Sequence, residues 1–453
     1  MNALELRASL ALSGLYALRM LGMFLILPVF ALYARTLPGG DNATLIGFAL
    51  GSYGLAQALL QLPFGMLSDR IGRKPVIYIG LFLFAAGSLL AASADTLFWL
   101  TIGRILQGSG AISAALTALL ADLTREENRT RAMAMVGMTI GITFAISLVL
   151  GPLLARLIGV PGIFALTGAL SVAGMIGTRW LIPTPSVERF HSDAEASRAR
   201  LPDVLHDSQL LRLNFGIFAL HAAQMAMFVV IPFALTETGG LDKAHHWQVY
   251  LPAVVAGFVL MVPAIIYGEK RHQLKRVFVG AIALMMVAQS SLGAGLHHFP
   301  ILVAALVLYF IAFNILEASL PSLVSKIAPP EAKGTAMGVY NTAQSLGLFI
   351  GGALGGWLYQ HLGASAVFIF CAGLMFTWWL MALTMQAPQP VKTQLIALPA
   401  HWQGDSRALA QQLSQYDGVK EVSVIAAEKV AYLKVMQAGW DEAGVKKLIQ
   451  EIC

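Results

Sequence analysis

The chain has 453 residues, of which 57% are hydrophobic and 12% are charged, and its formal net charge is +6. Soluble domains carry about 25% charged residues, so this composition excludes an ordinary water-soluble protein and indicates a membrane protein. The basic residues are spread over many short loops, which argues against nucleic-acid binding, and two cysteines exclude a disulfide scaffold or a Cys-rich metal site.

Long apolar stretches follow one another along most of the chain. About 20 apolar residues in a helix satisfy their own backbone hydrogen bonds across the ~30 Å core of a bilayer. We predict twelve membrane-spanning helices, at residues 9–34, 44–66, 75–94, 96–120, 132–158, 161–183, 211–236, 247–268, 276–296, 299–323, 334–359 and 363–386. The first stretch has no clean small-residue cleavage site, so we expect it to be retained as a span.

Lys and Arg are distributed unequally between the two sides that these spans define. One side carries most of them, in the N-terminal tail and in the loops near 67–74, 121–131, 184–210, 269–275 and 324–333. The opposite side carries only Arg35, Arg156 and Lys243. Positively charged loops stay in the cytoplasm, so both termini are predicted to be cytoplasmic.

The two halves of the membrane region repeat each other at an offset of 204 residues. This offset aligns Met23–Pro28 with Met227–Pro232, and Gly151 with Gly355. Six spans followed by six similar spans predict an all-α membrane protein of two six-helix bundles, with a binding site near the midplane between them. The predicted units are an N-terminal bundle at 1–183, a cytoplasmic linker at 184–210 and a C-terminal bundle at 211–386.

The composition changes after residue 386, which predicts a short linker at 387–392 and a soluble cytoplasmic domain at 393–453. Alternating apolar positions predict strands at 393–399, 419–425 and 429–436, and helices are expected at 404–415 and 440–452. The order βαββα is that of a small α+β ferredoxin-like domain.

The run at 417–424 resembles heavy-metal-associated domains, which bind metal through two cysteines after the first strand. The corresponding loop at 399–404 has no cysteine, so we expect no metal there. A regulatory or docking module and a passive stabilising appendage remain the alternatives for this domain.

The loop after the second span combines glycines, an aspartate and basic residues at a definite spacing. Gly65 allows close helix approach near the membrane surface, and Asp69 stands at a helix end, where it can pair with basic residues. Gly72 permits a tight turn into the next helix, and Arg70 with Arg73 anchors the loop. A loop that served only to keep positive charge on the cytoplasmic side would need the basic residues but not the glycines and the aspartate.

The run at 65–75 resembles the signature loop of the major facilitator superfamily, and 268–271 resembles a degraded second copy. This resemblance implies a transporter that opens alternately to the two sides of the membrane. It also implies that Asp69, Arg73 and Asp122 form a cytoplasmic charge cluster that clamps the outward-open state. A solvated surface network of little energetic weight is the alternative.

Other segments extend this resemblance over about residues 9–386. Gly151 and Pro152 belong to a run that resembles the helix-packing antiporter motif of the drug-exporter branch, although Ser147 and Ala155 replace glycines. The segments 19–24, 122–126 and 333–340 resemble bacterial facilitators that carry a soluble tail. That resemblance implies a proton-coupled transporter of the bacterial inner membrane.

Ionisable residues inside the spans are the candidates for transport chemistry, because each costs about 2.5–3.5 kcal/mol at mid-depth. Glu317 is a candidate proton carrier, or a structural carboxylate that is paired with an arginine or capped by Asn314. Arg19 and Arg104 are candidates for substrate contact or for tuning a nearby acid, with structural pairing as the alternative. His221 is either a helix-packing residue or a second proton site.

The leading hypothesis is a secondary active transporter that exports small organic or amphipathic compounds in exchange for protons. A proton symporter, a uniporter and a non-transporting sensor with the tail as its reader are the alternatives. No phosphate-binding Gly-x-x-x-x-Gly-Lys-Ser/Thr loop and no His-Glu-x-x-His motif occurs, which argues against an ATPase drive and an enzyme. The expected partners are a small-molecule substrate, protons and the lipid bilayer, without cofactor or metal, and a monomer is favoured.

Overall fold

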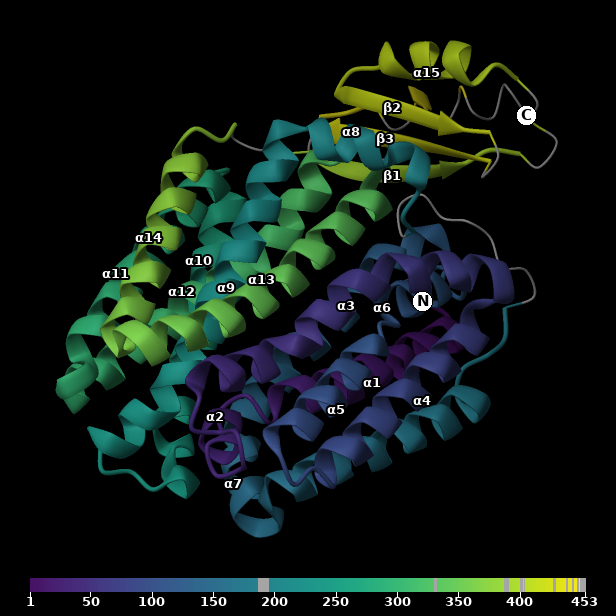
Figure 1. The fold of residues 1–453 in the computed structure, drawn as a ribbon. Coiled ribbons are helices and arrows are strands. Elements are labelled where there is room, and N and C mark those ends of the chain that lie inside the picture. The colour runs from purple at the N-terminus through teal and green to yellow at the C-terminus, as the bar shows by residue number, and fades with distance from the viewer. Residues whose placement is uncertain are drawn as a thin grey trace.

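The structure is a computed structural model that describes residues 1–185, 195–329, 332–386, 391–399, 402, 404–426, 429–436, 439–441, 444–445 and 448. Long helices make up most of the chain, and a small sheet stands at one end of them (Figure 1). The predicted class, an all-α membrane protein with a small α+β domain, is confirmed.

The first half contains seven helices, and two of the predicted spans are interrupted within it. The helices are α1 (Ala3–Phe24), α2 (Phe30–Ala34), α3 (Ala43–Ile71), α4 (Arg73–Ala92), α5 (Leu97–Ser109), α6 (Ser113–Asp122) and α7 (Glu126–Trp180). The first span breaks between α1 and α2, around Pro28, and the fourth breaks between α5 and α6, around Gly110. The predicted boundary between spans five and six lies inside α7, where Gly159 has φ 71° and interrupts the helix.

The second half is built from longer uninterrupted helices. Short helices at Arg198–Arg200 and α8 (Leu201–His206) lead into α9 (Ser208–Glu237), α10 (Trp247–Lys270), α11 (Leu274–Ala294), α12 (Phe299–Ile327), α13 (Lys333–Leu362) and α14 (Ala364–Leu383). Within the described residues, nine helical segments are long and apolar enough to cross a membrane, and the one at Arg131–Trp180 contains the Gly159 kink.

The internal repeat is visible in the way that equivalent helices pack. In the first half, a Cβ atom on Gly151 of α7 would lie 3.0 Å from Cγ of Pro28, beside the break after α1. In the second half, a Cβ atom on Gly355 of α13 would lie 2.7 Å from Cα of Ala226 on α9. The missing side chains therefore let α7 approach α1 and α13 approach α9, which are equivalent pairs at the offset of 204.

The two bundles meet along α3 and α13, which run side by side through the centre of the molecule (Figure 1). Glycines make this contact close: a Cβ atom on Gly352 would lie 2.6 Å from the carbonyl oxygen of Gly47. A Cβ atom on Gly51 would lie 2.8 Å from the carbonyl oxygen of Phe349. Backbone-to-backbone packing of this kind holds membrane helices together without a hydrophobic driving force.

The C-terminal domain is a three-stranded antiparallel sheet with a helix on one face. Its strands β1 (Val391–Ala397), β2 (Val419–Ile425) and β3 (Val430–Met436) have the order β1-β3-β2, and α15 (Ser406–Ser414) lies between β1 and β2 in sequence. Ala431, Leu433 and Val435 of β3 form a core with Leu409 and Leu413 of α15. Most of the predicted last helix, 440–452, lies outside the described residues.

The other face of the sheet lies against the membrane bundles. Val430, Tyr432 and Lys434 alternate with the core residues of β3, and all three are buried. The Lys434 ammonium donates a hydrogen bond of 3.3 Å to the carbonyl oxygen of Ile327, the last residue of α12. The domain is therefore docked on the end of the C-terminal bundle, at the top of the molecule in Figure 1.

The α3–α13 contact predicts that adding a methyl group at this interface destabilises the protein more than adding one at an open position. Gly352→Ala should lower the thermal unfolding midpoint in detergent, because the added methyl group overpacks a backbone contact, at a cost of about 1–3 kcal/mol. Gly373→Ala is the control, since a Cβ atom there meets no other atom within 4 Å. Equal midpoints for the two variants would contradict a tight α3–α13 contact.

Candidate functional site

Glu317 of α12 and His221 of α9 face each other inside the C-terminal bundle. The Nε2 atom of His221 lies 3.8 Å from the Oε2 atom of Glu317, which is an ion-pair distance but too long for a hydrogen bond. The imidazole is buried, whereas the Glu317 side chain is 35% exposed. One group of the pair is therefore enclosed, and the other reaches accessible space.

Gln344 of α13 completes this arrangement. Its side-chain nitrogen lies 2.8 Å from Nε2 of His221, while Nδ1 of His221 lies 3.2 Å from the carbonyl oxygen of Ile217. The network assigns a neutral imidazole in which Nδ1–H donates to Ile217 and Nε2 accepts from the Gln344 amide. A proton added to Nε2 would turn that nitrogen into a hydrogen-bond donor. The Glu317 carboxylate could then accept a hydrogen bond from it.

Several buried polar atoms around this pair have no hydrogen-bond partner within the described chain. They are Oε2 of Glu317, Nδ2 of Asn314, and the hydroxyl oxygens of Tyr309 and Tyr340. Buried polar atoms are normally satisfied by protein, water or ligand. This cluster therefore marks a place where water or a bound compound would be stabilised.

An aromatic contact joins this site to the N-terminal bundle. Phe144 of α7 lies 5.4 Å from Phe313 and 6.4 Å from Phe310 of α12, measured between ring centroids. Phe313 also contacts the His221 ring, at 6.0 Å. The site thus has a polar side on the C-terminal bundle and an apolar boundary toward the N-terminal bundle, a combination typical of small-molecule sites.

Arg19 and Arg104 lie within the N-terminal bundle and form no ion pair or hydrogen bond with Glu317 among the described residues. The Arg104 guanidinium donates to the side-chain oxygen of Gln107 at 2.8 Å and lies 4.9 Å from the ring centroid of Tyr53. Such a stack favours the structural interpretation of Arg104. Arg19 donates to the hydroxyl of Ser113.

The structure brings Asp69, Arg73 and Asp122 together. The Arg73 guanidinium pairs with Asp69 through Nη1, and its Nε lies 3.4 Å from Oδ2 of Asp122. A further carboxylate, Glu195 of the linker, lies 2.7 Å from Nη2 of Arg73. One buried guanidinium is therefore surrounded by three carboxylates, two from the N-terminal bundle and one from the linker.

The linker connects this charge cluster to the C-terminal bundle. The backbone N–H of Ser197 donates to the hydroxyl of Thr335 at 2.9 Å, in the first turn of α13. A Cβ atom on Gly334 would lie 2.6 Å from the carbonyl carbon of Glu195. The segment 195–197 therefore lies between Arg73 and the beginning of α13.

The remaining motif residues have identifiable structural positions. Gly72 has φ 97° and separates α3 from α4, a conformation that favours glycine. Gly65 approaches α6, since a Cβ atom there would lie 3.2 Å from Cβ of Ala114. Arg70 is exposed, and Pro152 follows Gly151 within α7.

Sequence reasoning missed Glu195, Gln344 and Glu5. Glu195 lies in a polar linker where no pattern separates it from its neighbours, and Gln344 is an ordinary polar residue in a glycine-rich span. Glu5 is buried and accepts a hydrogen bond of 2.9 Å from Nε of Arg125. The Asn2–Glu5 spacing is a capping-box signal that could have indicated the local role of Glu5.

Comparison with known proteins agrees with this architecture. The family model described as Major Facilitator Superfamily matches residues 12–269 and 269–423. The chain belongs to the major facilitator superfamily. It is therefore a membrane transporter rather than an enzyme.

Relatives within this family give a more detailed comparison. The chain is 45% identical to the inner membrane transport protein YajR of Escherichia coli (strain K12), over 95% of this chain and 94% of that protein. It is 27% identical to the multidrug resistance protein MdtH of Proteus mirabilis (strain HI4320), over 75% and 84% of the two chains.

Solved structures show the same fold at low sequence identity. The human organic anion transporter MFSD10 matches with a TM-score of 0.61 at 18% identity, over 84% of this chain and all of that one. The nucleoside transporter NupG matches with a TM-score of 0.65 at 16% identity, over 83% and 99% of the two chains.

The Glu5 contact predicts a pH-dependent contribution to stability. Hydrogen bonding from the Arg125 side chain outweighs burial and lowers the pKa of Glu5 from 4.5 to about 2. Because the folded-state pKa is lowered, the contribution is complete above about pH 4.5 and is lost as the pH falls toward 2. Glu5→Gln should therefore lower the unfolding midpoint at pH 7, and its difference from the wild type should shrink below pH 4.5.

The matched control is Glu237→Gln, since the Glu237 carboxylate is exposed and lies 3.9 Å from an exposed Arg35. Its effect at pH 7 should be small. A Glu5→Gln difference that stays constant between pH 7 and pH 3 would contradict the proposed electrostatic origin.

Proposed function

We propose that this protein exports small organic or amphipathic compounds in exchange for protons, by alternating access, from the cytoplasm across a bacterial inner membrane. The observation that carries the proposal is the His221–Glu317 pair between α9 and α12, at 3.8 Å. An imidazole and a carboxylate placed this close can share one proton without a large movement of either chain segment.

The neighbours of this pair support a proton step coupled to cargo. The Glu317 side chain is 35% exposed, although its Oε2 atom is buried, so the carboxylate can exchange a proton with water that reaches the exposed part of the side chain. With the proton on Glu317, His221 accepts from Gln344; with the proton on Nε2 of His221, the imidazolium faces an anionic Glu317. Cargo that forms hydrogen bonds with the unpartnered polar atoms nearby would change the energy difference between these two protonation states.

Export and orientation have separate support. The multidrug resistance relative MdtH and the close approach of Gly151 to Pro28 at the α1–α2 break favour the exporter branch. The excess of Lys and Arg on the side of the linker favours cytoplasmic termini. Oligomerisation is not required by this scheme, since one chain supplies both bundles.

The Arg73 cluster supplies the second element of the proposal, a conformational clamp. Three carboxylates hold one guanidinium at the linker end of the molecule, and the linker reaches from there to α13. Breaking these contacts would free the linker ends of the two bundles to separate. Such a cluster gives the protein two discrete arrangements, as alternating access requires.

Glu317→Gln tests the proton step. The variant should reduce flux driven by a pH gradient at least ~10-fold in liposomes, because an amide cannot carry the proton. The cargo is a compound chosen by a growth-protection screen that compares cells lacking this chain with cells overproducing it. An internal pH-sensitive dye reports countermoving protons.

The control for this measurement is Glu237→Gln, which removes an exposed carboxylate near Arg35 and should leave flux close to the wild-type value. Intact proton-coupled flux in Glu317→Gln would exclude the proposed proton carrier. Cargo binding by the wild type with no flux at all would favour the sensor hypothesis instead.

Asp69→Asn tests the clamp. Spin labels on Ile71 of α3 and Tyr267 of α10, which are both exposed, report the separation of the bundle ends when the native cysteines are replaced. The ratio of separated to closed molecules should rise at least ~5-fold, which is the lower end of typical conformational coupling. Asp95→Asn, an exposed aspartate elsewhere, should leave the distribution unchanged; an unchanged distribution in Asp69→Asn would refute the clamp.

A further inference from the structure

We propose that the N-terminal bundle contains a binding site for a small halide-type anion such as chloride, formed by Arg19 and the helix break before α6. The site is separate from the His221–Glu317 pair, which lies in the other bundle. The proposal does not depend on proton coupling or on the direction of transport.

The first observation is a buried cation without a counter-charge. The Arg19 residue is 3% exposed, and its Nη1 atom donates to the hydroxyl of Ser113. Its Nε and Nη2 atoms are buried and have no hydrogen-bond partner in the described chain, and no described carboxylate lies within 4.0 Å. A guanidinium buried in this way is costly unless an anion or hydrogen-bond acceptors compensate it.

The second observation is the break in the fourth span, directly beside Arg19. The helix α5 ends at Ser109, and α6 begins at Ser113, the residue whose hydroxyl accepts from Arg19. The preceding residue, Ile112, caps α6 without any side-chain hydrogen bond. The helix break that precedes α6 therefore lies beside the Arg19 side chain.

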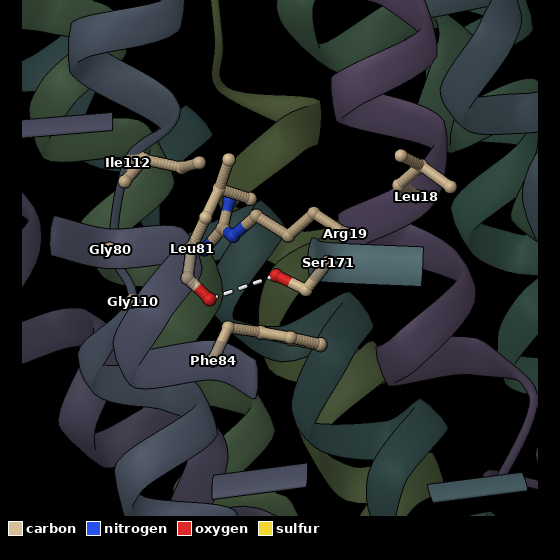
Figure 2. A pocket seen from close by; sticks show the side chains of 8 residues that line it. All are labelled: Leu18, Arg19, Gly80, Leu81, Phe84, Gly110, Ile112 and Ser171. Atoms are coloured by element: carbon tan, nitrogen blue, oxygen red, sulfur yellow. Dashed lines mark hydrogen bonds between the residues drawn. The ribbon is translucent and has the colours of Figure 1, made fainter. Parts of the chain in front are cut away.

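The third observation is a cavity at this place. It has a volume of about 10 Å³ and is lined by Leu18, Arg19, Gly80, Leu81, Phe84, Gly110, Ile112 and Ser171. Figure 2 shows the Arg19 side chain reaching from α1 toward Leu81, with Ser171 just below it. The hydroxyl of Ser171 is already engaged as a donor, to the carbonyl oxygen of Leu81 at 2.9 Å.

The size and polarity of the cavity determine the class of ligand. A cavity of about 10 Å³ is at the lower limit of the space that one water-sized particle needs, which excludes an organic cargo molecule. The Nε and Nη2 groups of Arg19, which have no hydrogen-bond partner in the described chain, are both donors. A halide ion accepts from both groups and neutralises the guanidinium, whereas water would have to find acceptors for its own hydrogens.

The test measures thermal unfolding of the full chain in detergent, in sodium chloride or bromide against sodium gluconate at equal ionic strength. The wild type should show a saturable rise in midpoint of at least ~2 °C with halide, since a ligand that binds only the folded state stabilises it. Arg19→Gln should abolish this rise, and Arg19→Lys should retain part of it. Arg35→Gln, at an exposed arginine, should respond like the wild type.

Bromide also allows a direct measurement on the unaltered protein, which keeps the proposal testable if Arg19→Gln does not fold. Crystals grown with bromide should show an anomalous peak within hydrogen-bond distance of Nε of Arg19. The proposal is overturned if the wild type responds equally to gluconate, if Arg19→Gln keeps the full halide response, or if the cavity holds water and no bromide.

Discussion

The high cost of an ionisable side chain inside a membrane governs this structure. Each such group must meet a partner, a cavity or water, because hydrocarbon offers no compensation. Glu317 meets His221 and accessible space, and Arg104 lies over the ring of Tyr53. Arg73 meets three carboxylates at the linker end. Arg19 alone among these four residues meets a single hydroxyl beside a cavity, which is why it suggests an additional ligand.

Much of the fold follows from the sequence because membrane spans obey a simple length and polarity rule. The boundary at Gly159 and the βαββ order of the tail were predicted within a few residues. The breaks inside the first and fourth predicted spans were not predicted, because a broken helix is as apolar as a continuous one. Pro28 and Pro232 illustrate the limit: they occupy equivalent positions, yet only the first lies at a break.

The candidate site was predictable where a residue type is unusual in its setting. Glu317 and His221 stand out as ionisable residues within spans, but neither their spacing nor the composition around them indicates that they face each other. Gln344 and Glu195 carry no such signal, because polar residues are ordinary in a helix interface and in a linker. Their roles depend on tertiary distances between segments more than 100 residues apart in the chain.

The attachment of the C-terminal domain has a consequence for how the molecule moves. Lys434 donates a hydrogen bond to a carbonyl group at the C-terminal end of α12, and the buried face of β3 covers that end. We therefore expect the domain to move together with the second bundle in the alternating-access scheme proposed above. The distance between a fluorophore on the domain and another at the amino terminus would thus report the movement of one bundle relative to the other. Both labels would lie outside the membrane interior.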